Sequence, residues 1–115
     1  MGQSVLVHRY CDARESGLMF KLELSRNALE DLKSLRKSDR VLILDSLEKS
    51  LAHEPTQENR QKKRLRPNLL SKWELRIDRF RIFYDVDLES QAILIKAVGW
   101  KDHNTLLIRG MEFQL

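Results

Sequence analysis

Hydrophobic and polar residues alternate in three segments of the chain, residues 20–24, 73–77 and 80–86. Such alternation is typical of strands that bury one face. Only Asp78–Arg79 separates the second segment from the third, which predicts a tight turn between two antiparallel strands. Residues 92–98 are nearly all apolar, as expected of a central strand that is covered on much of both faces.

Two further segments repeat their apolar residues at the spacing of an α-helix. The first follows Ser25, a good N-cap residue, and its repeat is Ala28, Leu29, Leu32 and Leu35. The second begins near Ser38–Asp39 and ends before Pro55, because the residue before a proline avoids the helical conformation. Its expected buried stripe is Val41, Leu44, Leu47 and Leu51, with Ile43 beside it. Very few residues join the two helices, so we expect an antiparallel helical hairpin.

The segments between these elements predict loops and a short helical tail. Residues 56–64 are entirely polar and should form an exposed loop, and Pro67–Asn68 indicates a turn. Gly99 is expected to end the last strand. A short final helix, begun by Asp102 or Asn104 and closed by Gly110, would carry Leu106, Leu107 and Ile108.

These elements predict one α+β domain in the order strand, helix, helix, three-stranded antiparallel meander and short C-terminal helix. The helical hairpin should pack on one face of the antiparallel sheet and leave the other face open. Residues 1–18 show no sustained period, so we expect an N-terminal extension with little contact to the core. The domain itself would span residues 19–115, and a chain of 115 residues has room for one core.

Composition narrows the functional classes. Apolar residues make up 42% and charged residues 33% of the chain, which is ordinary for a folded soluble protein. No apolar run approaches the roughly 20 residues that cross a bilayer, and no secretion signal is recognisable, so we expect a cytosolic protein without a membrane partner. The single Cys11 and the widely spaced His8, His53 and His103 match no metal-ligand pattern. We therefore expect neither a metal nor a cofactor nor a small-molecule ligand, and we interpret His53 as a structural residue at a helix end.

Basic residues are concentrated in one part of the chain. Residues 60–81 contain nine basic residues against two acidic ones, a net charge of +7, so the rest must carry −3 to give the total of +4. Such concentration is typical of a protein that binds a polyanion, although a solvated basic surface has the same pattern.

At this level of detail the chain resembles the RelE/ParE superfamily of bacterial toxins over residues 19–108. The resemblance rests on the first strand, the helix at Ala28–Leu32, the basic loop that ends in Lys63–Leu65, the strands Trp73–Ile77 and Phe80–Tyr84, and the strand end Val98–Gly99. Members of this family are toxins paired with an antitoxin. One branch cleaves messenger RNA in the ribosomal A site, and the ParE-like branch acts on DNA gyrase.

The resemblance also implies site residues. Arg81 falls on the family's phosphate-binding arginine, Arg76 on a basic strand residue, and Lys101 on a basic residue just after the fourth strand. Glu74 stands where the best-known branch has lysine, and Leu107 stands where it has a catalytic tyrosine. A carboxylate and a histidine could perform the same chemistry, and Glu74 and His103 are the candidates.

The residue pattern gives these assignments a physical basis. Glu74 and Arg76 lie two positions apart on a strand, so both should point to the non-core side. Arg81 of the next strand is expected on the same side, exposed to solvent. Arginine suits phosphate because its planar fork binds two oxygens at once. Glu74 and Arg76 could equally be a surface ion pair, and His103 an exposed turn residue. Trp73 and Tyr84 are expected in the core, and Trp100 is expected as a packed rim residue, with stacking on a base as the alternative. Four basic residues are expected to hold RNA phosphates, namely Lys62, Lys63, Arg64 and Arg66.

The sequence thus favours the toxin of a toxin–antitoxin pair that acts as a metal-independent endoribonuclease on messenger RNA at the ribosome. Its expected partners are an antitoxin, messenger RNA and the ribosome. Two alternatives remain: a ParE-like inhibitor of DNA gyrase that cleaves nothing, and a silenced family member that only binds its antitoxin or RNA.

Overall fold

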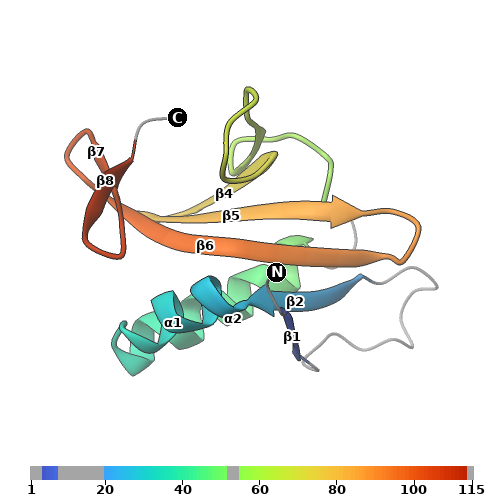
Figure 1. Ribbon diagram of the computed structural model, residues 1–115, viewed down its shortest axis with the longest axis horizontal. Helices are drawn as coiled ribbons and strands as arrows, with labels where there is room; N and C mark the ends of the chain where they lie inside the picture. Colours follow the sequence, from blue (N-terminus) through green and yellow to red (C-terminus); the bar gives the residue numbers. More distant parts are fainter. Residues whose placement is uncertain (1–3, 8–19, 52–54, 114–115) are drawn as a thin grey trace.

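The computed structural model describes residues 4–7, 20–51 and 55–113, of which residues 4–7 as backbone alone. Two helices lie along one face of the sheet, and the long strands β5 and β6 run through its middle (Figure 1). The α+β class and the helical hairpin packed on the sheet confirm the prediction. The elements are β1 (Ser4–Val7), β2 (Lys21–Ser25), α1 (Arg26–Lys33), α2 (Lys37–Leu51), β3 (Lys62–Arg64), β4 (Trp73–Ile77), β5 (Phe80–Asp87), β6 (Ala92–Asp102), β7 (Thr105–Ile108) and β8 (Met111–Phe113).

The strand order is β1-β2-β6-β5-β4-β3, and the β7–β8 hairpin continues from the far end of β6. The meander of β4, β5 and β6 is antiparallel, with a tight turn at Asp78–Arg79, as predicted. In contrast, β2 pairs with β6 in parallel. Parallel pairing requires a long connection, which here runs through the two helices and then β3, β4 and β5.

The main core lies between the helices and the sheet. Ile43, Leu47 and Leu51 are fully buried on α2 and pack in one cluster with apolar residues of the central strands. Leu44 is only partly buried, and Val41, expected in the buried stripe, is 55% exposed. The helix therefore turns the row that contains Ile43 towards the sheet, so the prediction for Val41 was wrong.

The second face of the sheet is not fully open, because a smaller apolar cluster covers part of it. This cluster consists of Phe83, Ala97, Leu106 and Ile108, with Leu65, Leu70 and Phe113 packed against it. Loop residues after β3 and the β7–β8 hairpin contribute most of its members. The expected open face is thus reduced to the space between these two segments.

The C-terminal segment forms strands where a short helix was predicted, so that prediction was wrong. Gly99 does not end β6, which continues to Asp102. A Cβ atom at Gly99 would collide with the carbonyl oxygen of Leu107, so glycine lets β7 approach β6 closely. Arg109 and Gly110 both have positive φ angles, 53° and 78°, as the tight turn of a β-hairpin requires.

The predicted N-terminal extension contains one described element. Ser4–Val7 forms β1, which pairs antiparallel with β2 in the register Ser4↔Ser25 to Val7↔Leu22. This pairing is a contact with the domain that the sequence analysis did not expect. His8, Cys11 and His53 lie outside the described residues. Neither of the described helices is long and apolar enough to cross a membrane.

Candidate nucleic-acid interface

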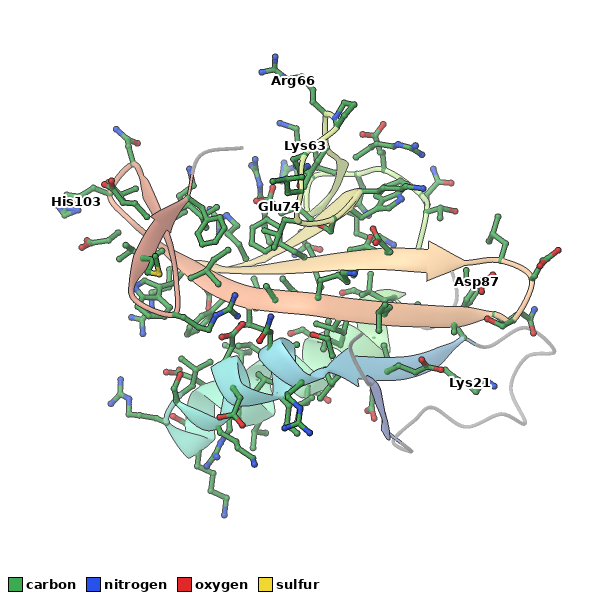
Figure 2. The ribbon with its side chains drawn as sticks, in the orientation of Figure 1. Lys21, Lys63, Arg66, Glu74, Asp87 and His103 are labelled. Carbon is green, nitrogen blue, oxygen red and sulfur yellow. The ribbon has the colours of Figure 1, made fainter. Side chains whose placement is uncertain are left out.

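A pocket of about 390 Å³ lies on the sheet face opposite the helices. Figure 2 shows Lys63, Arg66 and Glu74 together on this side, above the plane of β5 and β6. The pocket is lined by Lys63, Arg64, Leu65, Arg66, Glu74, Arg76, Lys101, Asn104, Leu106 and Phe113. Five of these residues are cations and one is an acid, so the lining attracts anions.

Strand pairing brings the polar lining together from elements far apart in sequence. β3 pairs antiparallel with β4, so Lys63 lies opposite Glu74, and Arg76 of β4 lies opposite Arg81 of β5. Lys101 comes from the end of β6. Because side chains two positions apart share a face, Glu74 and Arg76 point the same way, as the sequence predicted.

Glu74 is the buried acid of this group, with 8% of its side chain exposed. Its Oε1 atom accepts a hydrogen bond from Nε of Arg76 at 3.3 Å, and its Oε2 atom lies 4.0 Å from Nε of Arg81. A buried carboxylate needs such partners, since desolvating an unpaired charge costs several kcal/mol. Glu74 and Arg76 therefore form an ion pair, and this pair lies at the floor of a pocket rather than on an open surface.

Arg81 is placed differently from the expectation of an exposed strand arginine. Only 15% of its side chain is exposed, and it is absent from the pocket lining. Its Nη1 atom donates to the carbonyl oxygens of Asp78 and Phe80, at 2.8 and 2.9 Å. Burial lowers the pKa of Arg81, and Glu74 partly opposes this change. Arg81 thus holds the β4–β5 turn, and its buried Nε atom lies near Glu74 without a hydrogen bond.

Lys62 does not join the basic lining. It is buried, and its Nζ atom donates to the carbonyl oxygen of Ser50 on α2 at 3.0 Å. Neighbouring strand residues point to opposite faces, so Lys62 and Lys63 cannot both face the pocket. The structure therefore separates Lys62 from the three other basic residues predicted to contact RNA.

Of those three residues, Lys63 and Arg64 lie on β3, and Arg66 lies in an ordered loop after it. The side chain of Asn68 accepts hydrogen bonds from the amides of Leu70 and Ser71 and donates to the carbonyls of Arg66 and Ser71, at 2.7 to 3.0 Å. The turn predicted at Pro67–Asn68 is confirmed. The guanidinium of Arg64 also lies over the ring of Trp73, 5.8 Å from its centroid.

His103 is not brought to the pocket. It occupies the turn between β6 and β7 with a φ of 61°, its side chain is 90% exposed, and its Nδ1 atom lies 3.3 Å from Asp102. Figure 2 shows it at the tip of the hairpin, away from Glu74. Its neighbour Asn104 lines the pocket instead.

Sequence reasoning missed the apolar wall of the pocket, formed by Leu65, Leu106 and Phe113. Leu106 belongs to the smaller apolar cluster, and Leu65 and Phe113 pack against it, so the wall is held in place. Leu106 and Phe113 reach it only because residues 105–113 form a hairpin. A hydrophobic strand pattern in this short segment was the one available signal, and it is ambiguous with a helix.

Tyr84 takes no part in the chemistry of the pocket. Tyr84 is fully buried, burial raises its pKa, and its hydroxyl donates to the carbonyl oxygen of Pro55 at 2.7 Å. It stacks with Trp73 in the core, at a centroid distance of 6.1 Å, as the sequence predicted for both residues. Among the described residues, no group of three His, Cys, Asp or Glu side chains is placed to hold a metal ion.

Comparison with known proteins gives a family match and matches among solved structures. Residues 22–103 match the family described as the ParE toxin of the type II toxin–antitoxin system parDE. The fold resembles a chain in the crystal structure of the toxin–antitoxin complex RelBE2 from Mycobacterium tuberculosis, with a TM-score of 0.65 and 22% sequence identity. That alignment covers 75% of this chain and 95% of the other. A search of curated proteins gave no match.

Proposed function

This chain belongs to the ParE toxin family of type II toxin–antitoxin systems and is the toxin of such a pair, and we propose that it is a metal-independent endoribonuclease that cleaves messenger RNA on the ribosome. Its partners would be a cognate antitoxin, messenger RNA and the ribosome, so it would act in the cytoplasm. The observation that carries the proposal is a pocket whose lining combines five cationic residues with one buried carboxylate.

The cations supply the phosphate-binding part of the proposal. The guanidinium group of Arg76 presents forked donors that match phosphate oxygens, and Lys63 and Arg66 are exposed cations of the same lining. Phosphate contacts of this kind bind RNA without regard to sequence and position the strand. The apolar wall opposite them would exclude water from the bound phosphate, which strengthens every charge interaction there.

Cleavage would proceed by attack of the ribose 2′-hydroxyl on the adjacent phosphorus. The new bond joins the 2′-oxygen to phosphorus, the bond to the 5′-oxygen breaks, and the products are a 2′,3′-cyclic phosphate and a 5′-hydroxyl. We assign Glu74 as the base that accepts the 2′-hydroxyl proton, and Lys101 as the donor of a proton to the leaving 5′-oxygen. Arg76 would stabilise the negative charge that develops on the phosphorane.

Arg81 and His103 have other roles in this scheme. Arg81 does not line the pocket, so we assign it as a positioning residue that holds Glu74 and the turn. His103 lies on the exposed hairpin tip, so we assign it no part in the chemistry.

A second candidate function is inhibition of DNA gyrase without cleavage. It is favoured by the family match, which names ParE, and by the lack of histidine and tyrosine among the described residues that line the pocket. The basic pocket would then bind the antitoxin or another polyanion.

The test compares cleavage of messenger RNA with the rate of DNA synthesis after induction of the toxin in growing cells. Primer extension should reveal new 5′-ends in messenger RNA for the wild type and none for Arg76→Ala. Cleavage on purified ribosomes should be unchanged by EDTA added below the magnesium concentration, which removes zinc and manganese while the ribosomes stay intact. Intact messenger RNA together with halted replication would favour the gyrase alternative and overturn the proposal.

A further inference from the structure

A second hollow, of about 380 Å³, lies at the same end of β6 but on the side of the helices. It is lined by Leu35, Arg79, Phe80, Trp100, Lys101 and Asp102. These residues come from the turn between the helices, the β4–β5 turn and the end of β6. Of these residues, only Lys101 also lines the pocket described above.

Trp100 is the aromatic residue of this hollow that is partly exposed. One part of its ring packs against the main core, and its backbone pairs with Phe80 across the sheet. The ring is therefore held in a fixed position while part of it faces the hollow. A rigid aromatic surface of this kind is what unpaired nucleobases stack upon, because every base has a flat π-face.

Two cationic residues, Lys101 and Arg79, line the hollow together with this ring. Lys101 follows Trp100 directly, and its amide donates to the carbonyl oxygen of Arg79 at 2.8 Å, which ties the two residues together. The guanidinium of Arg79 lies over the ring of Phe80, 4.9 Å from its centroid, and its Nη2 atom is 3.8 Å from Asp39. Asp102 is the acid of the lining, and its carboxylate lies next to His103.

We propose that this hollow binds a base of single-stranded RNA stacked on Trp100, with the neighbouring phosphates held by Lys101 and Arg79. Because Lys101 lines both spaces, a strand whose phosphate lies in the first pocket can continue over this lysine into the second. The inference rests on the proposed function for the identity of the nucleic acid. An acidic peptide would use the cations but gains little from a flat aromatic ring, so the combination favours RNA.

The two tryptophans of the chain allow a direct test. Trp73 is buried against Tyr84, so a Trp73→Phe protein reports on Trp100 alone. Titration with a short single-stranded oligouridylate should quench its fluorescence saturably, since a stacked base quenches an indole. Fluorescence anisotropy of a labelled oligouridylate should show that Trp100→Leu weakens binding on the order of ten-fold, and that Trp100→Phe restores most of the loss.

Further variants keep the test decisive if Trp100→Leu does not fold. Arg79→Ala should weaken oligouridylate binding without removing the quenching at saturation, because the ring remains. Binding without quenching of Trp100 would overturn the inference and leave the endoribonuclease proposal intact. Quenching by oligoglutamate but not by oligouridylate would also overturn it and identify the hollow as a protein-binding site. Quenching by oligouridylate in a protein that cleaves no messenger RNA would support the hollow as an RNA site and count against the endoribonuclease.

Discussion

The carboxylate of Glu74 is the group on which the proposed chemistry depends, and it is held between two guanidiniums. Replacement by glutamine keeps the size of the side chain but removes the proton acceptor and one negative charge. Glu74→Gln should therefore bind RNA at least as tightly as the wild type, yet lose cleavage by roughly 10²-fold or more, as expected for a lost general base. Binding is measured by fluorescence anisotropy and cleavage by primer extension on ribosome-bound messenger RNA.

The opposite pattern would contradict this assignment. Wild-type cleavage by Glu74→Gln would remove the carboxylate from the mechanism. Circular dichroism at matched concentration serves as the control for folding, because a glutamine beside Arg76 and Arg81 leaves these cations without a counter-charge.

Arg81 provides a second prediction, because its role in the structure is mainly to hold other groups. Alanine at this position removes a cation near the buried Glu74 and the donor to two turn carbonyls. We expect Arg81→Ala to lose about 1–3 kcal/mol of unfolding free energy, seen as a fall of several degrees in Tm. Arg76→Ala should cost less, because 44% of that side chain is exposed. Equal Tm values for Arg81→Ala and the wild type would show that Arg81 does not stabilise the fold.

At the scale of elements, α1 completes the sheet where β2 ends. β2 pairs with β6 only as far as Ile95, so the next part of β6 lacks a strand partner on that edge. Ser25 caps α1 by accepting from the amide of Ala28, and its hydroxyl donates to the carbonyl oxygen of Lys96. Asp31 accepts from the amide of Val98 at 2.9 Å. Side chains of the cap and the helix thus take the place of missing ladder bonds.

Asp31 also joins α1 to the β7–β8 hairpin. Both of its carboxylate oxygens accept from Nη1 of Arg109, at 2.9 and 3.0 Å, while its own side chain is 2% exposed. Because Leu106 and Phe113 of this hairpin form the apolar wall, Asp31 and Arg109 fix the wall from the far side of the sheet. Such a buried ion pair is costly to break by removal of one partner.

The titration of Asp31 gives a prediction about pH. Burial raises the pKa of Asp31 above its ordinary value of 3.8, against the lowering effect of Val98 and Arg109. Between that value and the raised one, the folded protein holds more protons than the unfolded chain, so this group's contribution to stability falls as pH rises. The neutral variant Asp31→Asn lacks this pH-dependent contribution to stability.

The measurement is urea unfolding of the wild type and Asp31→Asn over a series of acidic pH values. The wild-type free energy minus that of Asp31→Asn should decrease as pH rises through the window above 3.8. Taking the difference cancels other acids, such as Asp87, whose pKa is lowered by Ser90. A difference that grows with pH would mean that Arg109 outweighs burial. Asp31→Ala, which leaves the Val98 amide unsatisfied, should be the least stable of the three proteins at every pH.

The elements that could be predicted from sequence are those with a long pattern and a clear boundary. β4 and β5 alternate over whole strands around a two-residue turn, and α2 has a proline close behind it. The β7–β8 hairpin has neither feature. Its four-residue strand Thr105–Ile108 is too short to show a period. The turns before and after this strand place His103 and Arg109 at positive φ, and neither residue type predicts that conformation.

The candidate site was predictable in its charge and unpredictable in its geometry. Clustering of basic residues in the chain already indicated an anion-binding surface. Which of them face the pocket depends on the register of β3, and an all-polar strand carries no apolar marker of its inner face. Lys62 is therefore turned to α2 and Lys63 to the pocket, although the two residues are chemically equivalent in sequence.

At the scale of the whole molecule, the helices cover one face of the sheet, and the basic pocket lies on the other (Figure 2). Counterion release should then govern RNA affinity, and the effect should be local to the pocket face. Replacing Lys63, Arg64 and Arg66 by alanine should lower the slope of log affinity against log salt by about 2, at roughly 0.7 per lost contact on single-stranded RNA. The titration is done by fluorescence anisotropy with an unstructured RNA from low to moderate salt.

A matched variant separates the pocket from net charge. Lys21, Arg26 and Lys33 are exposed on β2 and α1, and Figure 2 shows Lys21 far from Lys63 and Arg66. Their replacement by alanine also takes the net charge from +4 to +1. If phosphates lie in the pocket, this control keeps the wild-type slope, because long-range attraction is screened within about 10 Å at moderate salt. Equal losses of slope in the two triple variants would mean that the protein attracts RNA only by its total charge, and that the pocket binds no phosphate.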